Sequence, residues 1–165
     1  MNTFAEIDPK TVATHPNLIA KLPDYRKPHK TWYLLLVDDY LIIANATFKE
    51  RDSKWLHYQI EFPKRGLLWY LDTLKEKFFN TAAEGGLPKG VFHAIGEVDG
   101  ERLYLGRAFN ADGHGGGGYA FTTLDRKDAF LDMAKEYIFS DALLFEHGLM
   151  DLFEQIAAKI RSGEL

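Results

Sequence analysis

The 165-residue chain lacks cysteine altogether, has only three methionines, and contains no apolar run of the ~18 residues needed to span a bilayer. The missing cysteine excludes a disulfide scaffold, cysteine-containing zinc sites and thiol chemistry, and it suits a reducing compartment, so we expect a cytoplasmic protein. No basic segment followed by an apolar segment opens the chain, so we expect neither a secretory signal nor a membrane anchor. The hydrophobic fraction of 46% excludes a disordered chain.

Signatures of catalysis are also missing. Ser53, Ser140 and Ser162 do not lie in a Gly-x-Ser-x-Gly motif, and no glycine-rich segment is followed by the Lys-Ser/Thr pair of a P-loop. His57 with Glu61, and His93 with Glu97, share strand faces but lie ~13 Å apart along them and have no third ligand. We therefore expect no enzyme activity, no metal and no cofactor.

The chain has only a small excess of acidic residues, with a formal net charge of −4, but its basic and acidic residues are unevenly distributed. Residues 1–89 contain 13 Lys and Arg against 11 Asp and Glu, whereas residues 90–165 contain 7 against 13. An anionic ligand is therefore expected on the first half, and solvent or a protein partner on the acidic second half.

Four of the six prolines lie in residues 1–30, so we expect these residues to form a leader lying on the domain rather than regular structure. Two apolar runs, 32–37 and 40–48, predict a hairpin around Asp38-Asp39. Residues 55–62 alternate as a half-buried strand does, and Leu67 to Phe78 have the spacing of an amphipathic helix.

The pattern then restarts. Residues 91–98 and 102–109 predict strands joined at Asp99-Gly100, a glycine-rich loop covers 110–118, and 119–124 predict a third strand. Helical spacing of apolar residues predicts a helix from Asp125 to Ile138 and a last helix over 140–162.

An internal repeat is suggested by the segments Tyr70-Leu71-Asp72 and Phe130-Leu131-Asp132, which are 60 residues apart. We therefore expect an α+β fold in which residues 31–165 form one domain. Two β-β-β-α pseudo-repeats, 31–80 and 91–138, would supply curved antiparallel sheets packed on helices, with the helix 140–162 added at the end.

A strand repeat ending in Phe62-Pro63-Lys64-Arg65-Gly66-Leu67, followed by a helix with Tyr70-Leu71-Asp72, resembles a repeat of the PUR (purine-rich-element-binding) family and of the wider Whirly-like group. The resemblance implies binding of single-stranded DNA or RNA on a sheet face through basic and aromatic residues, and dimerisation. The basic–x–Asn strand motif of that family is absent, and the nearest substitute is Arg107-Ala108-Phe109-Asn110.

We therefore expect weak binding of single-stranded nucleic acid through a basic and aromatic sheet face, because cations neutralise phosphates and aromatic rings stack on bases. The candidate residues are Lys49, Arg51, Lys54, Trp55, Lys64, Arg65, Arg107 and Asn110. The alternative for Trp55 is that its side chain covers the sheet edge or packs under the leader. For the whole chain the alternatives are a protein-interaction module that uses the acidic second half, and a small-ligand pocket between sheet and helices.

Two segments remain. The loop Asn110–Gly118 is expected to be a flexible tip able to mould onto a ligand, with Asp112, His114 and Gly116 as its candidate contacts. The last helix has a wide apolar stripe, part of which is expected to form a homodimer contact through Leu149, Phe153 and Ile156.

Overall fold

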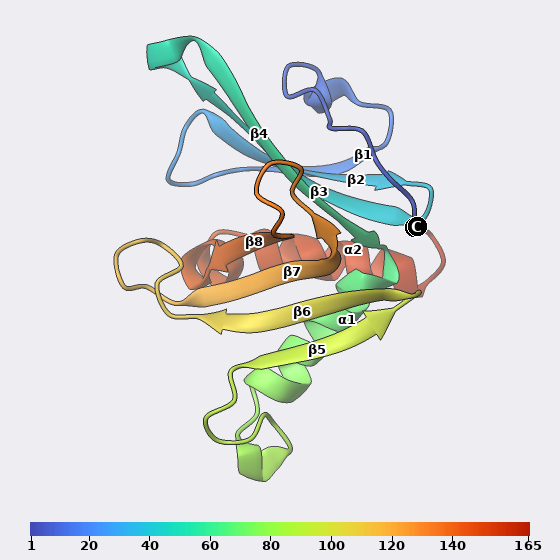
Figure 1. Ribbon diagram of the computed structural model, residues 1–165, viewed down its shortest axis with the longest axis vertical. Coiled ribbons are helices and arrows are strands. Elements are labelled where there is room, and N and C mark those ends of the chain that lie inside the picture. Colours follow the sequence, from blue (N-terminus) through green and yellow to red (C-terminus); the bar gives the residue numbers. More distant parts are fainter. The chain divides into compact units, whose positions relative to one another are not determined.

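The computed structural model describes residues 1–165 and confirms the α+β class. It contains two four-stranded antiparallel sheets, with strand orders β1-β2-β3-β4 and β5-β6-β7-β8 (Figure 1). The chain forms two compact units, residues 1–62 and residues 63–165. No helix is long and apolar enough to cross a bilayer.

The first unit is a meander of β1 (Leu18–Pro23), β2 (Lys30–Val37), β3 (Tyr40–Lys49) and β4 (Lys54–Pro63), with a 3-10 turn η2 (Glu50–Asp52) between the last two. Asp38 and Asp39 both have positive φ, 47° and 64°, as a two-residue hairpin turn requires. The predicted hairpin around these residues is confirmed, and Val37 pairs with Tyr40 across it.

Residues 1–30 are not merely a leader, because β1 lies within them and pairs with β2. Pro23 is the last residue of this edge strand, where a missing N–H costs no ladder bond. The segment before β1, with the 3-10 turn η1 (Val12–Thr14), covers one face of the sheet. Its Phe4, Ile7 and Val12 pack on an apolar cluster that includes Leu35 and Ile42.

The second unit begins with α1 (Arg65–Thr73), the π-helical turn η3 (Leu74–Phe78) and the 3-10 turn η4 (Ala82–Glu84). The strands β5 (His93–Val98), β6 (Glu101–Ala108), β7 (Gly118–Lys127) and β8 (Ala134–Ser140) follow, then η5 (Ala142–Glu146) and α2 (Leu149–Arg161). Within this unit α1 and α2 lie on the same face of the sheet (Figure 1). The predicted turn Asp99-Gly100 is confirmed, with φ of 50° and 83°.

Helix α1 is fixed to the second sheet by aromatic packing. The Tyr70 ring stacks on Phe121 with centroids 4.4 Å apart, and its hydroxyl donates to the Thr122 carbonyl at 2.8 Å. A Cβ at Gly96 would lie 2.3 Å from Trp69 Nε1, so glycine is what lets the indole lie on β5. Leu67, Tyr70 and Phe121 are wholly buried, and they anchor the segment that follows α1.

The predicted helix from Asp125 to Ile138 is wrong. Those residues form the end of β7, a turn over 128–133, and most of β8. The Asp128 carboxylate accepts hydrogen bonds from the backbone N–H groups of Phe130 and Leu131, which closes the turn locally and prevents helix formation. Phe130 is 92% exposed there, so it is not an equivalent of Tyr70 in a helix.

Residues 31–80 contain three strands followed by α1, as predicted, and β1 precedes them. The second pseudo-repeat, 91–138, is wrong, because it contains β5, β6, β7 and most of β8 in place of the expected helix. The strand β2 begins at residue 30 and its counterpart β6 at 101, whereas β3 begins at 40 and β7 at 118. These offsets are 101 − 30 = 71 and 118 − 40 = 78 residues, so a constant offset of 60 residues does not describe the arrangement. The glycine-rich loop between β6 and β7 accounts for the difference between the two offsets.

The last helix is confirmed over most of its predicted range, with a break at Gly148, whose φ is 93°. Its expected dimer contact is wrong. Leu149 and Phe153 are wholly buried and Ile156 is 4% exposed. These three side chains belong to the core, so they present no surface to a second chain.

Candidate functional site

A cleft of about 640 Å³ opens beside the second sheet. Its lining combines apolar, aromatic and cationic side chains and contains no aspartate or glutamate. Most of the lining comes from the connection between η3 and β5, and the rest from the end of η3 and from the neighbouring strands β6 and β7. The side chains used below are Lys77, Phe78, Lys89, Phe92, Arg107 and Tyr119.

The connection that forms this cleft is held by its own hydrogen bonds. The N–H of Leu87 donates to Lys77 O at 3.0 Å, and the N–H of Gly86 donates to Thr81 O at 2.8 Å. Thr81 donates to the Glu84 carboxylate through both N–H and hydroxyl, which lowers the pKa of Glu84. The wall of the cleft is therefore ordered before a ligand binds, so binding does not have to order the whole connection between η3 and β5.

Aromatic rings line the cleft from both sides. Phe78 and Tyr119 meet edge to face with centroids 5.5 Å apart. Phe92 is 51% exposed and meets Phe109, itself 65% exposed, in a second edge-to-face pair at 5.2 Å. The backbone bond from Arg107 N–H to Phe92 O, 2.8 Å long, holds this exposed pair at the end of the sheet. Exposed ring faces of this kind are available to stack on a planar ligand.

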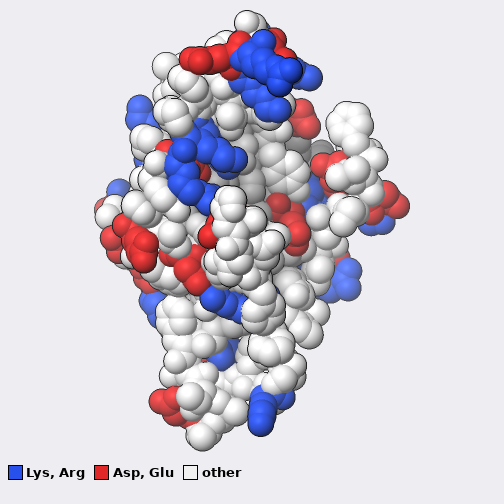
Figure 2. All heavy atoms as spheres, turned by 90° about the vertical axis from the view of Figure 1, so that its left-hand side faces the viewer, with Lys and Arg blue, Asp and Glu red and all other residues white.

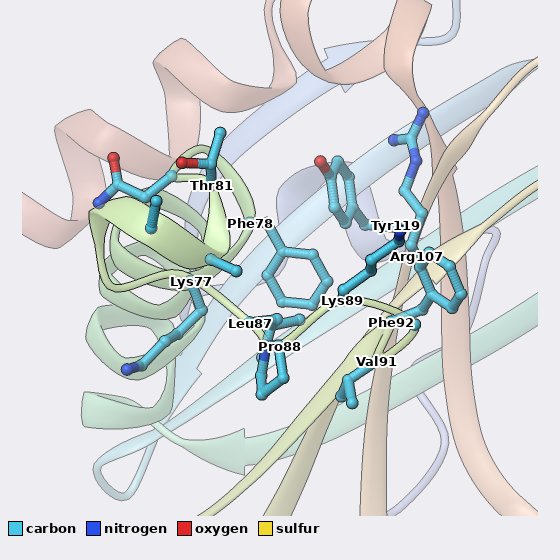
Figure 3. A pocket seen from close by; sticks show the side chains of 14 residues that line it. Lys77, Phe78, Thr81, Leu87, Pro88, Lys89, Val91, Phe92, Arg107 and Tyr119 are labelled. Atoms are coloured by element: carbon cyan, nitrogen blue, oxygen red, sulfur yellow. The ribbon is translucent and has the colours of Figure 1, made fainter.

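Three cations surround the rings (Figure 3). In that view the Lys77 side chain points away from Phe78 on one side, and Lys89 extends between Phe78 and Phe92 on the other. The Lys77 ammonium makes one long contact, 3.4 Å, to the Gly85 carbonyl. Lys89 makes no ion pair. Both ammonium groups are therefore available to an anion.

Arg107 is held differently. Its guanidinium binds the Asp141 carboxylate through two bonds of 2.7 Å and lies over the Tyr119 ring, 4.7 Å from the centroid. The hydrogen bonds that Arg107 donates to Asp141 raise the pKa of Arg107, and burial raises the pKa of Tyr119. A Cβ at Gly117 would lie 2.1 Å from Arg107 Nη2, so the glycine of the loop makes room for the guanidinium. Asp141 neutralises this cation, which leaves two unpaired cations at the cleft.

The cations expected to bind nucleic acid in the first half are not gathered into one basic surface. Lys49, Arg51 and Lys54 lie exposed around η2, where Glu50 and Asp52 alternate with them. Figure 2 shows the same mixture more widely, with Lys and Arg beside Asp and Glu over the face it presents. Charge of both signs at one hairpin tip gives little net attraction for a polyanion.

The remaining first-half candidates lie elsewhere. Lys64 and Arg65 stand at the start of α1 in the second unit, where Arg65 binds Asp99 and lowers the pKa of that carboxyl. Trp55 is half-buried against the apolar cluster of the first unit, with its ring 5.2 Å from Phe48. This contact matches the packing alternative for Trp55 and reduces the ring surface left for stacking.

The outward face of the second sheet is not basic either. Its row of paired residues runs Ile95, Tyr104, Thr122 and Glu136. Arg102 lies on the neighbouring row and is bound to Asp125 by a 2.6 Å ion pair. Of the predicted nucleic-acid residues, only Arg107 lines the cleft.

The glycine-rich loop is closed by its own side chains. The N–H groups of His114 and Gly116 donate to Asp112 Oδ1 at 2.7 and 2.9 Å, which lowers the pKa of Asp112. Asn110 Oδ1 accepts from the N–H of Gly115 at 2.6 Å. These donors are engaged inside the loop, so they do not form a phosphate cradle. Its flexibility stays a prediction.

The sequence analysis missed Lys77, Phe78, Lys89, Phe92 and Tyr119 as a group. A signal existed, because two lysines and two phenylalanines flank a Gly-Gly and Pro connection between a helix and a strand. That local pattern says nothing of Tyr119 and Arg107, which strand pairing brings to the same place. Elsewhere, no group of three His, Asp or Glu side chains is arranged to hold a metal ion.

Comparisons with protein-family models, curated proteins and solved structures give no match to this chain. The resemblance to PUR repeats therefore stays a prediction, and the proposed function rests on the residues that line the cleft.

Proposed function

We propose that the protein binds single-stranded nucleic acid in the cleft beside the second sheet. The observation that carries this proposal is a lining of three aromatic rings and three cations without a carboxylate. Proteins that bind single strands combine cations that follow the backbone with aromatic rings on which bases stack. The site proposed here differs from the sheet face expected from the sequence, and it shares Arg107 with that expectation.

A polymer fits this cleft better than a small anion. The two unpaired ammonium groups, on Lys77 and Lys89, lie on either side of Phe78 in Figure 3, so a strand that passes over this ring brings phosphates to both. The exposed Phe92–Phe109 pair extends the aromatic surface beyond the rings inside the cleft. Bases must be unstacked and unpaired to reach these rings, which favours a single strand over a duplex.

The proposed role is binding without a catalytic step, cofactor or metal, in the cytoplasm. The acidic balance of the second unit does not oppose it, because the lining itself is cationic. Residues 63–165 contain 12 Lys and Arg against 16 Asp and Glu, whereas residues 1–62 contain eight of each. Local charge at the site decides the contact with phosphate, and net charge mainly affects the rate of encounter.

The test is fluorescence anisotropy of a labelled twelve-nucleotide oligothymidine, titrated with the protein at several salt concentrations. Two phosphate contacts predict a slope of log K against log salt of about −1.4. Lys89→Gln should bring this slope to about −0.7. Phe92→Ala should weaken binding about tenfold, because stacking contributes ~1–3 kcal/mol per base.

The matched controls replace residues outside the cleft. Lys21→Gln removes an exposed lysine of β1, and Tyr25→Ala removes an exposed ring from the first unit. Both should bind the oligonucleotide as the wild type does. The proposal fails if the wild type does not bind at ~50 mM salt, or if Lys21→Gln changes the slope as much as Lys89→Gln does.

A further inference from the structure

The turn between β7 and β8 presents an apolar tip to solvent. Phe130, Leu131 and Met133 are 92%, 69% and 63% exposed. The turn is held in shape, because Asp128 O accepts from the N–H of Asp132 and the Asp128 N–H donates to Met133 O. Apolar side chains gathered on a shaped, exposed tip mark an interaction surface.

The charges around this tip are opposite to those around the cleft. Asp128 and Asp132 flank the apolar tip and Lys127 contacts Asp132 at 3.1 Å, so residues 127–133 carry two acidic side chains against one basic side chain. The cleft is apolar and aromatic at its centre, with Lys77 and Lys89 at its sides. The chain therefore carries both halves of a complementary pair: an acid-flanked apolar tip and a base-flanked apolar cleft.

One copy cannot join these halves to each other. Tyr119 lies at the beginning of β7, and the tip follows the end of the same strand at Lys127. Eight strand residues separate them by ~27 Å. The near-complete exposure of Phe130 agrees with this separation.

We propose that the tip of one copy docks into the cleft of a second copy, with Phe130 entering among the aromatic rings. This proposal uses the same cleft as the nucleic-acid proposal but does not depend on nucleic acid. A contact made by one turn is small, so the association is reversible and is expected in the micromolar to millimolar range. Occupants of the cleft exclude one another, so an oligonucleotide that binds there dissociates the copies.

The test is sedimentation velocity without nucleic acid, from about 10 to about 300 µM protein. The wild type should show a rising weight-average sedimentation coefficient. Phe130→Ala and Phe92→Ala should each weaken association at least thirtyfold, as loss of a central aromatic anchor does. Tyr25→Ala, which removes an exposed ring from the first unit, is the matched control and should associate as the wild type does.

Mixing the Phe130→Ala and Phe92→Ala variants distinguishes specific docking from a loss of nonspecific hydrophobic association. Phe130→Ala keeps its cleft and Phe92→Ala keeps its tip, so an equimolar mixture should form a one-to-one pair with a single tip-in-cleft contact. A monomeric wild type at about 300 µM, normal association of Phe130→Ala, or a mixture that stays monomeric would each overturn the proposal. Association without oligonucleotide binding would refute the nucleic-acid proposal and leave this one standing.

Discussion

Breaking the ion pair between Arg107 and Asp141 should lower the stability of the fold and raise the affinity of the cleft for single-stranded nucleic acid. Asp141 holds the guanidinium by two 2.7 Å bonds and neutralises it beside the cleft. Asp141→Asn keeps the size of the side chain and removes its charge. The substitution should weaken the fold and at the same time give the cleft a third cation for phosphate.

The size of both effects follows from the geometry. Hydrogen bonds between charged groups contribute ~1.5–3 kcal/mol when buried. The side chains of Arg107 and Asp141 are 28% and 40% exposed, so solvent screening reduces the expected loss to ~1 kcal/mol. For a chain of this size that corresponds to a fall in Tm of about 2–4 °C. The third phosphate contact should move the salt slope from about −1.4 to about −2.1 and tighten low-salt binding about fivefold.

Two assays read this prediction: thermal unfolding by circular dichroism, and oligothymidine anisotropy over a salt series. Asp151→Asn, at an exposed position of α2, removes the same charge away from the cleft and serves as the control. A variant that binds more weakly than the wild type, with an unchanged salt slope, would refute the reasoning. It would mean that Asp141 positions Arg107 for the ligand and does not compete with it.

Three further predictions concern the scaffold. Gly96→Ala should lower Tm by several degrees, because overpacking against Trp69 costs ~1–3 kcal/mol, and the same change in a Trp69→Ala background should cost much less in a double-mutant cycle. Trp55→Ala should lower the urea midpoint but leave oligonucleotide affinity unchanged, and a large loss of affinity would restore the first-half site. The hydrogen bond from Arg102 lowers the pKa of Asp125 from 3.8, so its stabilisation is complete above that value and is lost as pH falls through the lower folded value. The difference in urea midpoint between wild type and Asp125→Asn should therefore shrink below pH 3.8, and a constant difference would contradict the ion pair.

Local sequence predicted the elements whose signals are local. The turns at Asp38-Asp39 and Asp99-Gly100 were predictable because two adjacent residues supply the positive φ that a short hairpin needs. Helix α1 was predictable from its apolar spacing. Strand β1 was not predicted, because the four prolines of residues 1–30 argued against regular structure, whereas Pro16 precedes the strand and Pro23 ends it.

The mistaken helix over 125–138 shows where spacing fails. Phe130, Leu131 and Met133 have helical spacing, but they are the exposed tip of a turn that the Asp128 carboxylate closes. The strand Ala134–Ser140 pairs with β7, and this long-range pairing outweighs the local pattern. The mistaken helix also led to the mistaken 60-residue repeat, because its predicted segment Phe130-Leu131-Asp132 resembles Tyr70-Leu71-Asp72 in α1.

The candidate site was predictable only in part. Arg107 was chosen for its charge, but its partner Asp141 and its ring contact with Tyr119 depend on strand pairing between β6 and β7. Dividing the charge at residue 89 placed an anionic ligand on the first half. The chain instead divides into its two units after residue 62, and the first unit has equal numbers of basic and acidic residues.

The most direct test of the central claim is an amide chemical-shift map, recorded on the 15N-labelled protein at low concentration during titration with unlabelled oligothymidine. The cleft predicts the largest changes in the Lys89–Phe92 segment and at Arg107 and Tyr119, and small changes around η2 and in the β7–β8 turn. Changes centred on Lys49–Lys54 or on the Ile95–Glu136 row of the sheet, or no changes at all, would contradict it.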